Sequence, residues 1–165
     1  MQSIYSHTSD PLPFQWLARE KPLCSNTKFI DVDYEPLMET KREIIFNQSD
    51  MKGLLHSVVP GPVNGEPAVI VDSQEYSALG CDLRNLRKLG KLLRSVVDLE
   101  DSMILCIAED STCYMRMEAA NALISWTSGL SAGDYAIFPV NSDGGHGGGL
   151  TICRRNLLHS RAAQP

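Results

Sequence analysis

Acidic side chains follow three apolar runs of the chain, where they could bind a ligand or begin a helix. They are Asp31 and Asp33 in FIDVD, Asp82 after YSALGC, and Glu109 and Asp110 after SMILCI. At the end of a strand in a nucleotide-binding sheet, a carboxylate commonly accepts hydrogen bonds from ribose hydroxyls, because it offers two acceptor oxygens. At the start of a helix, a carboxylate instead interacts favourably with the helix N-terminus. Both interpretations are open for each acid.

The glycines and histidines do not add a second binding motif. A nucleotide-binding sheet normally opens with a strand and a glycine-rich turn, but no glycine precedes Asp10. The run Gly144–Gly149 lacks the Gly-Lys-Ser/Thr ending of a phosphate loop, so a flexible linker is the favoured interpretation. His146 has no second histidine or thiol at ligand spacing, and we expect no metal site.

The cysteines are predicted to be free and mostly buried thiols. They are far apart and contain no C-x-x-C pair, which disfavours a zinc site or a disulfide framework. Two of them flank Glu109, but the sequence names no base that would activate a nucleophilic thiol. The five are Cys24, Cys81, Cys106, Cys113 and Cys153.

The spacing of apolar residues predicts strands that alternate with helices. Strands are expected at 28–32, 68–71, 102–108 and 134–140, and in a short run that ends at residue 82. Helices are expected at 14–19, at 35–55 with a break near 47–50, at 84–97 and at 116–127. The last helix should bury Ala119, Ala120, Leu123, Ile124 and Trp126. This alternation indicates an α/β sheet with right-handed crossovers.

Length and composition are typical of one globular domain. The 165 residues are 43% hydrophobic and 21% charged, which is enough for a substantial core. No apolar run approaches the roughly 20 residues that span a bilayer, and the first ten residues do not resemble a signal peptide. We therefore expect a cytoplasmic protein that makes no contact with membranes. Residues 10–140 are the predicted domain, and residues 141–165 a glycine-rich, mostly irregular tail.

One helix carries a candidate patch for nucleic acid. The net charge of -5 gives no overall footprint for such a partner, so binding would require a local cluster of cations. The predicted helix at 84–97 places five cations on the face opposite its leucines. A solvated helix face is the alternative interpretation. The cations are Arg84, Arg87, Lys88, Lys91 and Arg94.

Five segments, in this order, closely resemble the leucine carboxyl methyltransferase family of S-adenosylmethionine-dependent enzymes. They are DPLPFQWLA, FIDVDYEPLMETKREII, YSALGCDLRNLRKLGKLL, SMILCIAEDSTCYM and EAANALISWTSGLS. The phrase GCDLRNL, and ILCIAE followed by S-T-x-Y-M, are most similar to one fungal branch of this family. That branch methylates and methoxycarbonylates wybutosine precursors in phenylalanine tRNA. The alternative is the branch that methylates the C-terminal leucine of protein phosphatase 2A.

The resemblance implies a Rossmann-like class I methyltransferase fold, S-adenosyl-L-methionine as cofactor and phenylalanine tRNA as partner. Asp33, in D-x-D-Y, matches the acid that holds the adenosine ribose. Asp82 and Leu83 match the pair that lines the adenine. Glu109 matches the acid beside the methionine moiety, and Tyr114 matches a tyrosine that faces the site.

Part of the family pattern is lacking, so we expect the fold to be incomplete. Residues 6–9 stand where the family has its Gly-Cys-Gly turn, and the first strand before that turn is missing. In the family this strand lies at the centre of the sheet, between the strands that end at Asp33 and Glu109. Only residues 2–6 could take that place, and they are too short and polar for a buried strand.

These departures predict how the chain behaves. We expect a truncated α/β fragment of marginal stability that binds the cofactor weakly or not at all and has no measurable transferase activity. A non-catalytic fragment, either a pseudoenzyme or a partner that completes the sheet of another chain, is the remaining alternative.

Overall fold

A computed structural model describes residues 26–62, 66–99, 102–109, 114–130, 137–140 and 150–156 of the chain. The predicted helix at 14–19, the segment at 2–6 and the first residues of the predicted strand at 134–140 lie outside these ranges. So does the glycine run at 144–149.

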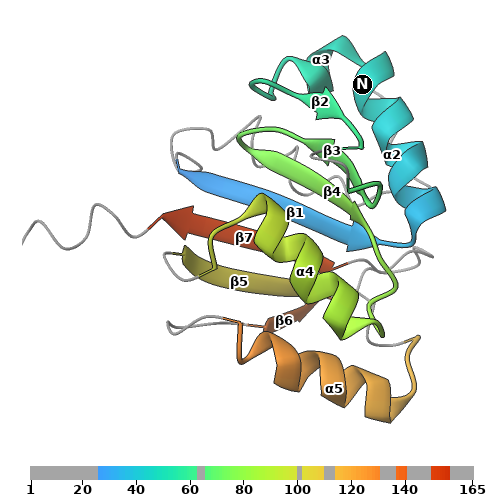
Figure 1. Cartoon of the computed structure of the whole chain (residues 1–165), viewed down its shortest axis with the longest axis vertical. Helices are drawn as coiled ribbons and strands as arrows, with labels where there is room; N and C mark the ends of the chain where they lie inside the picture. The colour runs from blue at the N-terminus through green and yellow to red at the C-terminus, as the bar shows by residue number, and fades with distance from the viewer. Residues whose placement is uncertain are drawn as a thin grey trace, which may run out of the picture.

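Seven strands form one mixed sheet in the order β2-β3-β4-β1-β7-β5-β6 (Figure 1). Strand β1 pairs in parallel with β4, and β5 pairs in parallel with β6. The remaining neighbours are antiparallel. The strands are β1 (Thr27–Asp33), β2 (Val59–Pro60), β3 (Val69–Asp72), β4 (Tyr76–Gly80), β5 (Ser102–Glu109), β6 (Ile137–Val140) and β7 (Leu150–Asn156).

Helices cover both faces of the sheet, and each face has its own core cluster. One cluster joins Ile30 and Val32 of β1 to the buried leucines of α4 (Leu86–Val96) and to Leu123 of α5 (Met117–Thr127). The other joins Phe29 of β1 to the buried residues of α2 (Glu35–Asn47) and α3 (Ser49–Lys52). The fold is therefore mixed α/β, as the alternation of patterns predicted.

Local sequence signals explain where the helices begin and end. Pro36 stands in the first turn of α2, where its missing N–H costs nothing, and the helix ends at Asn47, inside the predicted break. Asn85 caps α4: its side chain accepts a hydrogen bond from Lys88 N at 3.1 Å. The last helix buries less than predicted: Leu123 is buried, Ile124 is 42% exposed, and the others are half-buried, namely Ala119, Ala120 and Trp126.

Strand β7 corrects the prediction for the end of the chain. Residues 141–165 were expected to be mostly irregular, but Leu150–Asn156 forms a strand between β1 and β5 and pairs antiparallel with both (Figure 1). This is the central place that the sequence left without a strand. Each buried backbone group without a partner costs about 1–3 kcal/mol, so β1 and β5 gain much from any segment that can pair with them. Thr151 and Ile152 have side chains that favour strands.

None of the helices in the described part of the chain is long and apolar enough to cross a membrane.

Candidate functional site

The carboxyl ends of β1 and β4 lie side by side and carry the two acids of the predicted site. Asp33, the last residue of β1, pairs with Gly80, the last residue of β4. The next residue, Cys81, donates a backbone hydrogen bond from its N–H to the carbonyl of Asp33 at 2.8 Å. A Cβ at Gly80 would lie 3.0 Å from the Cα of Glu35, so the glycine permits the start of α2 to approach β4.

The register of the sheet places the backbone of Glu109 level with that of Asp33. Val32 of β1 and Ala108 of β5 both pair with Leu150 of β7. Asp33 and Glu109 each follow by one residue, on strands that run in the same direction. Because neighbouring strands are about 4.8 Å apart, two steps across the sheet separate these backbones by about 10 Å. Three predicted residues, Asp33, Asp82 and Glu109, therefore belong to one edge of the sheet.

Asp33 is a half-buried carboxylate, and among the residues that the structure describes one backbone N–H donates a hydrogen bond to it. Its Oδ1 accepts a hydrogen bond from Tyr34 N at 2.7 Å. Burial raises the pKa of Asp33, and the bond from Tyr34 and the charge of Lys41 lower it by less. No side chain caps α2, so Asp33 is not a helix cap. Within the described residues, its second oxygen accepts no hydrogen bond, and it could accept one from a ligand.

Asp31, two residues earlier, is excluded from ligand binding by its own partners. It lies inside β1 rather than after it, and it is 4% exposed. Its Oδ2 forms an ion pair with Lys41 Nζ of α2 and accepts a hydrogen bond from the Tyr76 hydroxyl at 2.9 Å. Asp31 therefore belongs to a buried network that joins α2 to the sheet, which neither sequence interpretation foresaw.

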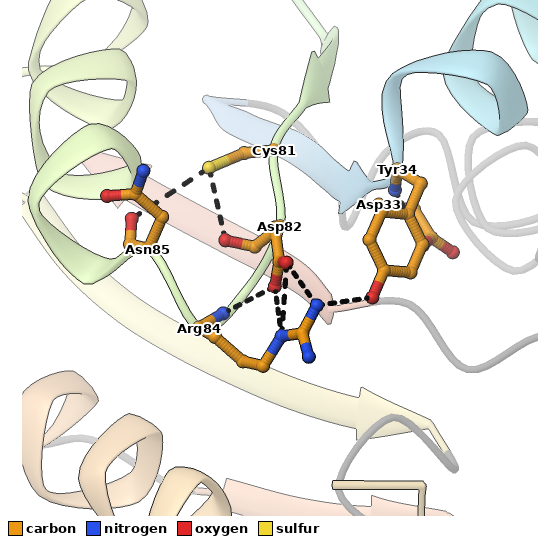
Figure 2. A network of polar contacts seen from close by, with 6 residues as sticks. All are labelled: Asp33, Tyr34, Cys81, Asp82, Arg84 and Asn85. Atoms are coloured by element: carbon orange, nitrogen blue, oxygen red, sulfur yellow. Dashed lines mark hydrogen bonds and ion pairs between the residues drawn. The ribbon is translucent and has the colours of Figure 1, made fainter.

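Asp82 is held by a neighbouring cation, as Figure 2 shows. Arg84 Nη2 lies 2.5 Å from Asp82 Oδ2, and Arg84 Nε lies 2.9 and 3.0 Å from the two carboxylate oxygens. The backbone N–H of Arg84 also donates to Oδ1 at 2.9 Å. These hydrogen bonds from Arg84 lower the pKa of Asp82. Asp82 does not cap α4, because Asn85 does.

Tyr34 connects the two acidic segments across the sheet edge. Its hydroxyl accepts a hydrogen bond from Arg84 Nη2 at 3.3 Å (Figure 2). The side chain is 51% exposed, although it is large and aromatic. The bridge from Asp82 through Arg84 to Tyr34 thus spans the ends of β4 and β1.

The other two residues implied by the resemblance differ in exposure. Leu83 is buried, at 6% exposure, in the core cluster beneath α4 and α5. Tyr114 is 67% exposed, and it forms no hydrogen bond or ion pair with the other candidates in the part of the chain that the structure describes.

The predicted basic face is partly neutralised by neighbours. Arg84 pairs with Asp82, and Lys91 lies 3.5 Å from Glu66. Lys88 donates to the carbonyl of Gly80 at 3.2 Å, and Arg94 donates to that of Gly90 at 3.1 Å. Among the residues that the structure describes, the exposed guanidinium of Arg87 has no such partner.

The thiols that can be described are free and buried, as predicted. They are Cys81 and Cys106. Burial raises the pKa of Cys106 to about 12, so this thiol is not poised to act as a nucleophile. No group of three or more potential metal ligands occurs within the described ranges.

Two residues near the site, Lys41 and Tyr34, were not predicted from the sequence, although the position of Lys41 gave a signal. Met38, Lys41 and Ile45 are the buried residues of α2, so Lys41 stands on the apolar face of that helix. A lysine at such a position indicates a buried acidic partner. Tyr34 is the last residue of the D-x-D-Y motif, which assigns it no role. Its hydrogen bond with Arg84 joins residues that are 50 positions apart in the sequence, so no local pattern predicts it.

Known proteins similar to this chain come from fungi and are much longer. No family model matches the chain. It is 43% identical over 122 residues to tRNA wybutosine-synthesizing protein 4 of Emericella nidulans, and equally identical over 122 residues to that of Aspergillus oryzae. The protein of the same name from Gibberella zeae is 36% identical over 129 residues. These matches cover 74–78% of this chain but only 11–13% of each relative.

The names of these relatives agree with the branch that the motifs GCDLRNL and ILCIAE indicated, so that resemblance is confirmed. The matched part of this chain belongs to the fungal wybutosine-synthesizing branch.

Proposed function

We propose that this chain is part of an S-adenosylmethionine-dependent methyltransferase that acts on phenylalanine tRNA in wybutosine synthesis. The observation that carries the proposal is the row of Asp33, Asp82 and Glu109 along one edge of the sheet. The names of the fungal relatives supply wybutosine synthesis and tRNA, and the resemblance of the motifs supplies methyl transfer. Because the chain spans about an eighth of those relatives, the activity of the whole protein is part of the proposal.

The arrangement of strands is compatible with a Rossmann-like methyltransferase sheet. In open α/β sheets, ligands bind outside the carboxyl ends of the parallel strands. Here β4, β1, β5 and β6 end at a common edge, and helices cover both faces. The exception is β7, which runs antiparallel in the central place.

Asp33 fits the ribose of the cofactor. A carboxylate that is half-buried and has an acceptor oxygen available can bind the two adjacent hydroxyls of a ribose. We assign the adenine to Asp82, with Leu83 supporting that segment from the core, and the methionine moiety to Glu109. Tyr114 stays a candidate for the substrate side.

The cofactor, when bound, supplies a methyl group on a positively charged sulfur. Transfer of such a methyl group would require no covalent bond to the protein. The contribution of the chain is to hold the nucleoside at Asp33 and Asp82 while the acceptor approaches in line, and orientation of this kind supplies much of the rate.

Titration with S-adenosylhomocysteine tests this assignment. Replacing Asp33→Ala removes a hydrogen bond to a charged acceptor, so we expect affinity to fall about ten- to a hundredfold in calorimetry. The matched control is Asp50→Ala, which removes an exposed acid from α3 and should leave affinity unchanged. Equal binding by the wild type and Asp33→Ala would reject the ribose assignment. Melting curves of both variants show whether they fold.

A binding assay tests the RNA partner. Hypomodified phenylalanine tRNA and a peptide with the C-terminus of protein phosphatase 2A are offered side by side to the wild type and to Arg87→Glu. We expect the tRNA to bind, Arg87→Glu to weaken it, and the slope of log affinity against log salt to fall by about one. Binding of the peptide alone would favour the protein-methylating branch.

A further inference from the structure

One residue, Arg84, supplies three donors to the carboxylate of Asp82. An ionised carboxylate has about four positions at which donors can bind. Arg84 N donates to Oδ1, Nη2 donates to Oδ2, and Nε lies between the two oxygens, all at 2.5–3.0 Å. A ligand that donates to Asp82 therefore competes with Arg84 for these oxygens.

The side chain of Arg84 can rotate away from Asp82 into solvent. It is 60% exposed, and besides Asp82 its only other hydrogen bond within the described residues goes to the Tyr34 hydroxyl, at 3.3 Å. An exposed ion pair of this kind is weak, because water competes for both partners. The backbone N–H of Arg84 would stay on Oδ1 after the guanidinium moves away, so the loop keeps part of its structure.

We propose that Arg84 is a built-in competitor that occupies Asp82 until a nucleoside with an exocyclic amino group displaces it. The inference rests on the proposed function, because it takes Asp82 as the acceptor for the base. Adenine can donate one N–H of its exocyclic amino group to this carboxylate. Displacement also breaks the bridge from Asp82 through Arg84 to Tyr34, which spans the ends of β4 and β1 (Figure 2). Arg84 thereby lowers the affinity of every ligand that donates to Asp82.

Removal of the competitor should tighten binding. We expect Arg84→Ala to bind S-adenosylhomocysteine about two- to fivefold more tightly than the wild type, which corresponds to the strength of an exposed ion pair. Lys52→Ala is the matched control, since it removes an exposed cation of α3 that does not contact Asp82. Its affinity should equal that of the wild type. Equal or weaker binding by Arg84→Ala would overturn the proposal and assign Arg84 to holding the ligand.

A second ligand identifies the donor. S-Inosylhomocysteine carries a carbonyl oxygen where S-adenosylhomocysteine has its amino group, so it cannot donate to Asp82 from that position. The preference for the adenosyl ligand over the inosyl ligand should be several-fold larger in Arg84→Ala than in the wild type. An unchanged preference would show that Arg84 does not compete with the base.

A measurement without ligand distinguishes an error in the role of Arg84 from an error in the proposed cofactor site. An NMR titration should show the pKa of Asp82 rising toward its ordinary value in Arg84→Ala but not in Lys52→Ala. If this rise is absent, the pair does not form in solution and the competitor role is wrong. If the rise occurs but neither the wild type nor Arg84→Ala binds S-adenosylhomocysteine, the proposed cofactor site is wrong, and the role of Arg84 falls with it.

Discussion

Asp31 and Asp33 lie two residues apart on one face of β1, but they differ in burial and in hydrogen-bonding partners. Asp31 is 4% exposed, Lys41 compensates its charge, and the Tyr76 hydroxyl donates a hydrogen bond to it. Within the described ranges, Asp33 accepts a hydrogen bond from one backbone N–H, and burial raises its pKa. The difference shows that position within the strand decides the role. A carboxylate inside the sheet requires a cation from the covering helix, while a carboxylate at the strand end keeps an acceptor for a ligand.

The largest effect is expected when the buried acid loses its cation. Lys41→Met leaves the carboxylate of Asp31 uncompensated in the core, and we expect the free energy of unfolding to fall by about 3–5 kcal/mol in urea titrations. Adding Asp31→Leu to this variant should restore most of the loss, because an apolar pair of similar volume packs without desolvating a charge. A loss below about 1 kcal/mol in the single variant would show that Asp31 is not buried as described.

A smaller effect is expected at the second partner of Asp31. Tyr76→Phe removes one hydrogen bond to a charged acceptor but keeps the ring and the ion pair with Lys41. We expect the free energy of unfolding to fall by about 1.5–3 kcal/mol. The exposed Tyr34→Phe is the matched control, and its stability should change by less than about 0.5 kcal/mol. Equal effects at the two tyrosines would contradict the contrast between the buried network and the strand end.

Most of this region could be predicted from local patterns. The run FIDVD indicated β1, the break near residue 48 indicated the end of α2, and the continuous apolar run SMILCIA indicated β5. The order of these elements then placed Asp33, Asp82 and Glu109 at one edge, because parallel strands share the direction in which they end. These inferences rely on residues that are near in sequence or on a general rule of α/β sheets.

Long-range pairings could not be predicted in the same way. No local pattern in the sequence of β7 predicts its central place in the sheet. That place follows from backbone hydrogen bonding with β1 and β5, which are more than 40 residues away in the sequence. The pairs of Asp31 with Lys41 and Tyr76 depend on how α2 and β4 approach β1. Arg84 was assigned to a basic helix face, whereas its nearest partner is the acid two residues before it. Periodicity assigns a residue to a face, but it does not identify the partner.

The smallest expected effect concerns the strand-end acid, and its sign is opposite to that of the others. Burial raises the pKa of Asp33 above 3.8 in the folded chain. The carboxylate of Asp33 therefore binds a proton more tightly in the folded chain than in the unfolded chain. The free energy of unfolding then falls as pH rises from 3.8 through the raised pKa, and the loss is complete at neutral pH.

Asp33→Asn has no such titration and keeps an acceptor for Tyr34 N. At pH 7 its melting temperature should therefore exceed that of the wild type, while below pH 3.8 the two should agree. In the same variant S-adenosylhomocysteine should bind more weakly, since the amide offers one acceptor oxygen instead of two. A variant that is both less stable and a weaker binder at pH 7 would show that Asp33 is a structural acid like Asp31, and the contrast between the two positions would fail.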